Sequence, residues 1–292
     1  MSIATVGIIG VGNMGMAMAR ALRNSGFAVC ARDIRTEAEA AAAQIGAAVA
    51  GDACQLAEMS DLILVVVVDA DQIEDALFRE QRPASAGWKP GTPVLLCSTV
   101  APDDAQRLGA KITQAQGVPI DAPMSGGPRR AAAGTLSFML AGDEGALERI
   151  SPVLSALSHH RYRISTRPGD GARMKLINNL LAGINLAAGA QALAAGEAMG
   201  LDLTQMLDVI QASSGQSWIV EDRMRRVAGG DLEPRAHASI LTKDLTLAMS
   251  MLQRAGRISS LGAAALARFQ AALEAGAGDL DDGILLSLER DA

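Results

Sequence analysis

A lysine and an asparagine stand out on a long apolar stretch near the middle of the chain. Residues 169–199 read as one helix whose aliphatic side chains cover the whole circumference, a pattern typical of a buried helix. Lys175 and Asn179 are four residues apart, so they share one face, with Gly183 next in that row. A lysine buried there costs free energy unless a charged or hydrogen-bonding group meets it. The alternative is a lysine that reaches solvent from the first turns of the helix.

A second polar element is the glycine-rich segment that begins at Asp121. Ser125, Gly126 and Gly127 close a predicted strand, and the next strand begins near Gly134. A Ser-Gly-Gly turn offers successive backbone N–H groups and a hydroxyl, a combination that can hold a carboxylate. The alternative is a flexible glycine turn, which would need neither the preceding proline nor the basic pair that follows.

The N-terminal segment carries a dinucleotide-binding pattern. An apolar strand over residues 4–10 leads into Gly10, Gly12 and Gly15, with Asn13 and Met14 between them, and a helical pattern continues to Gly26. These glycines permit a tight turn, the approach of a pyrophosphate and close packing of helix on strand, while the helix N-terminus favours the anion. A strand–turn–helix context at this position makes the pattern specific.

An acidic residue follows the next strand, residues 27–33. Asp33 lies about 18 residues after the last glycine of the pattern, where a carboxylate can accept the hydroxyls of an adenosine ribose and repel the extra phosphate of NADP. Arg32 and Arg35 could instead bind that phosphate. The pattern favours NAD, and the alternative for Asp33 is a solvated loop carboxylate.

Strand and helix patterns then alternate, with helices over 36–45, 70–78 and 103–116 and strands over 62–68 and 93–100. This alternation predicts an α/β fold with a doubly wound parallel sheet, in which ligands bind at the carboxyl ends of the strands. The residues there are Val68, Asp69 and Thr99, which we predict as cofactor contacts. Thr99 could also be an ordinary helix cap before Pro102.

The second half of the chain reads as helices alone. Gly, Pro and Asp separate five helical patterns, over residues 203–213, 218–228, 240–256, 261–276 and 281–289. Abundant Ala, Leu and Met with few charges favours packing across a subunit interface, so we expect a homodimer or homotetramer. Trp218 begins one of these helices, and we expect it in the core or at a subunit contact, with a place in the substrate cleft as the alternative.

Composition excludes several classes of function. The 292 residues suffice for two domains, and the net charge of −6 without a basic run argues against nucleic acid and anionic membranes as partners. The long helix is interrupted by polar residues and no signal peptide is recognisable, so we expect a cytoplasmic protein. The three cysteines are scattered and the three histidines form no cluster, which predicts reduced thiols and no metal site.

Four motifs in order resemble those of the β-hydroxyacid dehydrogenase family, which includes 3-hydroxyisobutyrate dehydrogenase. They are the glycine turn, DAPMSGGPRRAAAGTL, GDGARMKLINN and Lys243-Asp244-Leu245. The resemblance covers the whole chain and implies a Rossmann domain, residues 1–165, and an all-helical α domain, residues 166–292, joined by a helix over about 171–199, with the active site in the cleft.

The resemblance also implies roles for single residues. Lys175 would be the catalytic general acid and base, Asn179 its neighbour at the substrate, and Ser125, Gly126 and Gly127 the carboxylate site. Lys243 would lie close to cofactor and substrate. Because a free lysine has a pKa of about 10.4, burial or the positive nicotinamide must lower the pKa of a lysine that acts as a neutral base.

One departure from the commoner members concerns the substrate. Arg130 stands where they have glycine, and with VVVVDADQ and SSGQSWIVEDRMRR it resembles the L-threonate dehydrogenase branch. Arg130 would bind a longer, more polar acid, or it is a surface charge. The expected reaction is NAD-dependent oxidation of a small hydroxy acid, such as 3-hydroxyisobutyrate or L-threonate. The alternatives are a semialdehyde reductase that uses NADPH and a non-catalytic dinucleotide-binding regulator.

Overall fold

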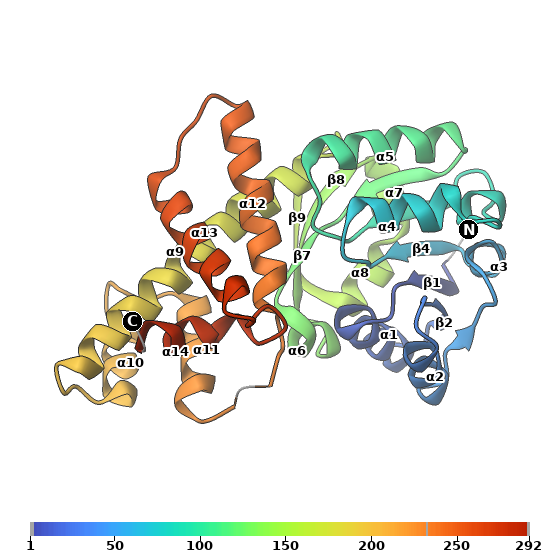
Figure 1. Ribbon diagram of the computed structural model, residues 1–292. Helices are drawn as coiled ribbons and strands as arrows, with labels where there is room; N and C mark the ends of the chain where they lie inside the picture. Colours follow the sequence, from blue (N-terminus) through green and yellow to red (C-terminus); the bar gives the residue numbers. More distant parts are fainter. Residues whose placement is uncertain (1–2, 232, 291–292) are drawn as a thin grey trace. The chain divides into compact units, whose positions relative to one another are not determined.

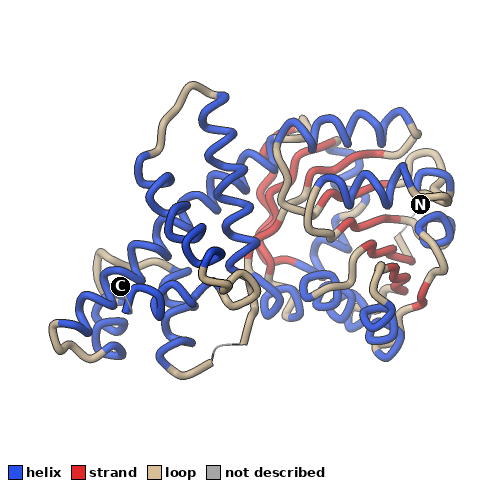
Figure 2. Tube along the Cα trace, viewed as in Figure 1, coloured by secondary structure: helices blue, strands red, loops and turns tan. Residues whose placement is uncertain are grey.

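The chain forms two compact units, residues 1–175 and 176–292 (Figure 1). The computed structural model describes residues 3–231 and 233–290. The first unit is an α/β structure around one sheet and the second consists of helices (Figure 2). The α/β and all-α fold classes are therefore as predicted, while the predicted domain boundary at residues 165/166 stays a prediction.

The sheet of the first unit has nine strands within the described residues, in the order β3-β2-β1-β4-β5-β6-β8-β7, with β9 also paired to β8. The first six strands in this order run parallel, and β8 runs antiparallel to β6. The strands are β1 Thr5–Ile9, β2 Ala28–Arg32, β3 Ala48–Val49, β4 Leu62–Val65, β5 Pro93–Leu96, β6 Val118–Asp121, β7 Met124–Ser125, β8 Leu136–Gly142 and β9 Ser158–Ser165.

Helices cover both faces of this sheet (Figure 1). In β4, Leu62 and Leu64 join one core cluster while Ile63 and Val65 join the other, so every residue of the strand is buried, as in a parallel sheet with two covered faces. The helices of the first unit are α1 Asn13–Asn24, α2 Thr36–Gln44, α3 Ala53–Glu58, α4 Ala70–Glu74, η1 Asp75–Arg79, η2 Ala84–Ala86, α5 Pro102–Gln114, α6 Gly127–Ala132, α7 Glu144–Arg149 and α8 Ser151–Leu157.

Several predicted elements are shorter than the sequence pattern suggested. The strands predicted over 62–68 and 93–100 end at Val65 and Leu96. The neighbour β1 of the first strand ends at Ile9, opposite Val65, and the second strand ends opposite Val65 and Asp121, the last residues of its own neighbours. The helix predicted over 70–78 changes into a π-helix at Asp75. The helix α6 was not predicted, and it begins within the Ser-Gly-Gly turn itself.

The second unit is built around the long helix α9, Asp170–Ala198, which starts in the first unit. Leu186 and Leu193 of α9 pack in one core with Leu245 and Phe269. By length and composition α9 could cross a membrane, a test that buried core helices also pass. The other helices are α10 Leu203–Gln211, α11 Trp218–Ala228, α12 Ala238–Arg254, α13 Ser260–Glu274, η3 Asp282–Ile284 and α14 Leu285–Arg290.

Candidate functional site

The glycine turn after β1 is shaped to receive a dinucleotide. Gly10 has a φ of +89°, and a Cβ there would lie 2.5 Å from the carbonyl oxygen of Val66. A Cβ on Gly15 would lie 2.0 Å from the Gly10 oxygen, so only glycine allows α1 to pack so close to the strand. Gly12 precedes α1, which begins at Asn13 and Met14, and provides no side-chain cap. The amides at this helix N-terminus therefore suit a pyrophosphate.

Asp33 lies beside this turn. One carboxylate oxygen accepts a hydrogen bond of 2.8 Å from the Val11 N–H, and the other accepts from the backbone N–H and the Nε of Arg35 at 3.0 and 3.2 Å. Burial alone would raise the pKa of Asp33, but these hydrogen bonds hold it below its ordinary value. The buried carboxylate is charged at neutral pH, and the solvated-loop alternative is wrong.

The two arginines near Asp33, Arg32 and Arg35, have different ion-pair partners. Arg32 forms an ion pair of 2.6 Å with Glu39 and also donates to the carbonyl of Asp33. Arg35 pairs with Asp33 while its side chain stays 58% exposed, and a Cβ on Gly12 would lie 3.3 Å from its Nη2. Arg35 is therefore the arginine that faces the glycine turn.

The remaining predicted cofactor contacts of the first unit follow β4 and β5. Val68 is half exposed and donates its N–H to Gln72, while Asp69 caps α4 by accepting from the Gln72 N–H at 2.9 Å. Thr99 follows β5 and is partly buried. It is not the cap of α5, because that position belongs to Ala101.

The Ser-Gly-Gly turn joins the short strand β7 to α6. Gly126 and Gly127 have φ values of +132° and +68°, which glycine adopts without strain. Arg130 folds back over the turn: a Cβ on Gly126 would lie 2.9 Å from the Arg130 Cβ, and the Arg130 Nε donates to the Thr135 carbonyl at 3.0 Å. Ser125 is partly exposed, and its strand pairs with β8. Arg130 therefore lies against Gly126 of the turn, while its Nε is bonded to Thr135 beyond the end of α6.

Lys175 is buried near the start of α9 with only 8% of its surface exposed, and the solvent-reaching alternative is therefore wrong. The helix start is tied to β6, because one carboxylate oxygen of Asp121 accepts from the N–H groups of Gly169 and Ala172 at 2.8 and 2.9 Å. Burial is the main reason that the pKa of Asp121 rises to about 6, against the lowering effect of these amides.

In the second unit, a buried carboxylate joins the two other predicted residues. Asp244 of α12 accepts a hydrogen bond of 2.6 Å from the Asn179 Nδ2 and forms an ion pair of 2.9 Å with the Lys243 Nζ. Asn178 donates to the Asn179 oxygen at 3.1 Å. Asn179 is thereby fixed in orientation, one helical turn after Lys175.

Asp121 and Asp244 were not predicted as functional residues. A weak signal was present for each. Asp121 follows an apolar run at the carboxyl end of a predicted strand, and Asp244 lies between Leu241 and Leu245 on the apolar face of a predicted helix. Both positions favour a buried carboxylate, which must be hydrogen-bonded.

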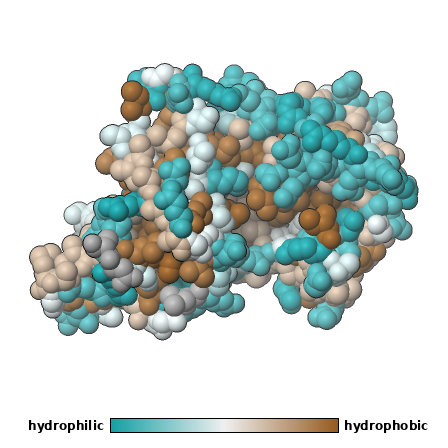
Figure 3. Space-filling model, viewed as in Figure 1, coloured by the Kyte–Doolittle hydropathy of each residue, from teal (hydrophilic) through white to brown (hydrophobic). Residues whose placement is uncertain are grey.

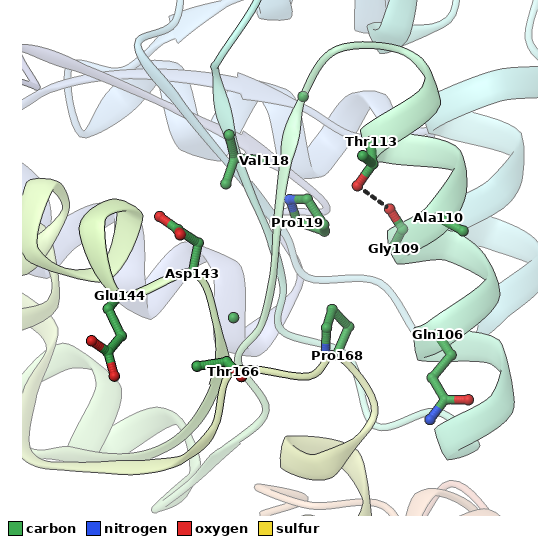
Figure 4. A pocket seen from close by; sticks show the side chains of 12 residues that line it. Gln106, Gly109, Ala110, Thr113, Val118, Pro119, Asp143, Glu144, Thr166 and Pro168 are labelled. Carbon is green, nitrogen blue, oxygen red and sulfur yellow. Dashed lines mark hydrogen bonds between the residues drawn. The ribbon is translucent and has the colours of Figure 1, made fainter.

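A cavity of about 730 Å³ lies elsewhere in the first unit (Figure 4). It lies beside α5, the beginning of β6 and the β8–α7 turn, where Asp143 and Glu144 are found. None of the predicted site residues lines it. The beginning of β6 is the edge of the sheet opposite the glycine turn, so this cavity is separate from the dinucleotide region.

The described residues contain no group of three potential metal ligands. His159 and His160 lie within strand β9, where both are exposed. The three cysteines are buried and unpaired, in agreement with the expected reduced thiols, and burial raises the pKa of the thiols of Cys30, Cys54 and Cys97. Their thiols are therefore poor nucleophiles at neutral pH.

Known protein families match both units. Residues 5–166 match the NAD-binding domain of 6-phosphogluconate dehydrogenase, and residues 169–288 match the NAD-binding domain of NADP-dependent 3-hydroxyisobutyrate dehydrogenase. The chain is 38% identical to L-threonate dehydrogenase of Escherichia coli, over 97% of this chain and 94% of that protein. It is 30% identical to NAD-dependent L-serine dehydrogenase of Pseudomonas aeruginosa, over 97% of each chain.

A solved structure shows the same fold. The crystal structure of 3-hydroxyisobutyrate dehydrogenase from Salmonella typhimurium matches with a TM-score of 0.90 and 36% identity, over 97% of this chain and 99% of that chain.

Proposed function

The chain belongs to the 3-hydroxyisobutyrate dehydrogenase family, and from this membership we propose that it oxidises a small hydroxy acid with NAD as the hydride acceptor. We propose a four-carbon sugar acid such as L-threonate as substrate, because five L-threonate dehydrogenases are 35–38% identical to the chain. One observation carries the proposed chemistry, namely a buried Lys175 with Asn179 one turn later on the same helix.

The proposed roles follow from the chemistry of each group. The N–H groups of Gly126 and Gly127 and the Ser125 hydroxyl hold the substrate carboxylate. Lys175 takes the proton from the oxygen of the substrate hydroxyl as hydride leaves the carbon that carries this oxygen, and it returns the proton in the reverse direction. Bound NAD supplies the hydride acceptor. Asn179 and Lys243, both held by Asp244, orient the substrate and the cofactor.

The first test concerns Lys175. We expect Lys175→Ala to lower kcat by about 10²- to 10⁴-fold, the usual contribution of a general acid or base. The affinity for NAD should change little, because the glycine turn and Asp33 are untouched. Measured rates of NAD reduction with L-threonate, D-glycerate, 3-hydroxyisobutyrate and L-serine would identify the substrate. Near-full activity of the variant would contradict the role of Lys175, and the absence of turnover by the wild type would contradict the proposed substrates.

A second candidate function is a semialdehyde reductase that uses NADPH. Arg35 favours the use of NADPH, since its side chain is 58% exposed beside Asp33 and could meet a 2′-phosphate. Rates of aldehyde reduction with NADH and NADPH distinguish the two. A preference of at least tenfold for NADH supports the Asp33 assignment, whereas equal rates would favour the alternative.

We further propose that the protein forms a homodimer or homotetramer through the helical unit. Ile177 and Leu181 are exposed and lie four residues apart on one face of α9. Trp218 is also half exposed, so the prediction that it lies in the core is wrong. Figure 3 shows apolar side chains gathered on the face near α11 and α14. Leu181→Glu should lower the mass measured by light scattering, while Ile258→Glu, at a fully exposed position outside α9, should leave it unchanged. An unchanged mass for Leu181→Glu would contradict this interface.

A further inference from the structure

The carboxylate of Asp121 connects two parts of the first unit that are far apart in sequence. It lies at the end of β6, with 1% of its surface exposed. One of its oxygens accepts hydrogen bonds from Gly169 and Ala172, which are 48 and 51 residues away. These amides belong to the start of α9, where the helix dipole also favours a negative charge. The carboxylate therefore anchors the first turn of α9 to the central sheet.

The first turn of α9 has almost no room to move toward the sheet. A Cβ on Gly171 would lie 2.6 Å from the Met139 carbonyl oxygen of β8 and 3.0 Å from the Asp121 oxygen. Gly169 has a φ of +96°, and a Cβ there would lie 2.9 Å from the Pro102 carbonyl oxygen. Backbone atoms of β8 and α5 limit the approach of the helix, and the carboxylate limits its withdrawal. The helix start is thus held from both sides.

The two residues proposed to contact the substrate, Lys175 and Ser125, are close in sequence to the residues that form this anchor. Lys175 follows Ala172 by three residues on a continuous helix, a rise of about 4.5 Å. Ser125 follows Asp121 by four residues, and its strand β7 pairs with β8. A shift of the helix at Asp121 would therefore move Lys175 relative to the carboxylate-binding turn.

We infer that Asp121 is a positioning residue that sets the place of Lys175 relative to the Ser125–Gly127 turn through its hydrogen bonds to the start of α9. This inference rests on the roles proposed for Lys175 and Ser125. Asp121 itself does not take part in the reaction. It acts by holding the backbone of α9 in place.

The first unit offers a control carboxylate at an exposed position. Asp61 also accepts two backbone hydrogen bonds through one carboxylate oxygen, from the Ala4 and Thr5 N–H groups, both at 2.9 Å. These bonds lie at the beginning of β1, at the edge of the sheet opposite the glycine turn. Asp61→Ala removes the same number of backbone hydrogen bonds as Asp121→Ala without touching α9.

The kinetic test compares Asp121→Ala, Asp121→Asn and Asp61→Ala. Because a misplacement of about 1 Å can cost on the order of 100-fold, we expect Asp121→Ala to lower kcat by roughly 30- to 100-fold with little change in NAD affinity. Asp121→Asn keeps an oxygen that accepts both N–H groups and should stay within about fivefold of the wild type. Asp61→Ala should stay within about twofold. Equal losses in Asp121→Ala and Asp61→Ala, or no rescue by asparagine, would overturn the inference.

A second readout does not depend on activity. Hydrogen exchange of the amides in residues 169–175 should be at least tenfold faster in Asp121→Ala and close to wild type in Asp121→Asn and Asp61→Ala. Unchanged exchange in Asp121→Ala would overturn the inference even if the enzyme is active. A wild-type protein that oxidises no hydroxy acid would instead contradict the proposed function, and the exchange rates would still decide whether Asp121 anchors the helix.

Discussion

The two stretches of α9 are held in different ways. In the first unit, residues 170–175 are held through their own backbone, because a main-chain N–H there donates to the Asp121 carboxylate and Gly171 lies against the Met139 carbonyl. In the second unit, the helix is held by apolar side chains such as Leu186 and Leu193, and by the side-chain contact of Asn179 with Asp244.

This difference predicts different tolerance to change. The carbonyl that contacts the first stretch cannot move aside unless strand β8 moves with it. The side chains around the second stretch can instead change rotamer or repack. Lys175 is at the end of the stretch with backbone contacts. The group proposed to transfer the proton is therefore on the less adaptable part of the helix.

The largest expected contrast is between Gly171→Ala and Gly183→Ala. A Cβ on Gly171 meets the Met139 carbonyl oxygen at 2.6 Å, whereas a Cβ on Gly183 meets side-chain carbons of Leu245 at 2.7 Å or more. We expect Gly171→Ala to lower kcat by about 100-fold. Gly183→Ala should change kcat by less than about fivefold, because overpacking costs roughly 1–3 kcal/mol and alanine regains about 1 kcal/mol of helix propensity. Steady-state rates and Tm values test this, and equal effects would contradict the comparison.

The next contrast concerns the two buried carboxylates. Asp244→Ala should lower kcat/KM by about 10- to 100-fold, since Asn179 and Lys243 both lose their contact with the Asp244 carboxylate. Asparagine should restore only part of the activity at position 244, because the ion pair with Lys243 needs a charge. At position 121 the hydrogen-bond donors are neutral backbone amides, so asparagine should restore most of the activity there. Comparable rescue at both positions would show that charge is unimportant at Asp244.

A smaller effect is expected at the cofactor. Asp33→Asn keeps an acceptor for the Val11 N–H but removes the charge that pairs with Arg35. The expected preference of at least tenfold for NAD over NADP should then fall to about threefold or less, because a 2′-phosphate would no longer meet a carboxylate. The ratio of kcat/KM for the two cofactors measures this change. An unchanged ratio would place the selectivity elsewhere.

The smallest expected effect is on stability and pH. Because the pKa of Asp121 rises from 3.8 to about 6, the folded chain binds more protons than the unfolded chain between these values. The contribution of Asp121 to stability therefore falls as the pH rises from about 4 to 6. Asp121→Asn lacks this loss, so its stability relative to the wild type should rise over that range by about 2 kcal/mol, or roughly 4–8 °C in Tm, and then level off. A constant difference between pH 4 and 7 would contradict the buried, raised pKa.

Much of the fold could be read from local sequence. The glycine turn, the alternating strands and helices and the long helix depend on short-range patterns, and α9 occupies 170–198 where a helix over about 171–199 was predicted. Strand ends were less predictable, since β4 stops where its partner β1 stops. The helix α6 was missed because Gly126 and Gly127 indicate a turn, although the helix begins at Gly127 itself.

For the candidate site, the sequence by itself determined which polar residues and glycines lie together, because spacing alone puts Lys175 and Asn179 on one helix face and the Gly10–Gly15 turn before a helix. Only the tertiary structure decided what holds them. Asp121 contacts amides 48 and 51 residues away, and Asp244 contacts an asparagine 65 residues away. Such partners leave no local pattern, since a buried carboxylate is placed by the packing of whole strands and helices around it.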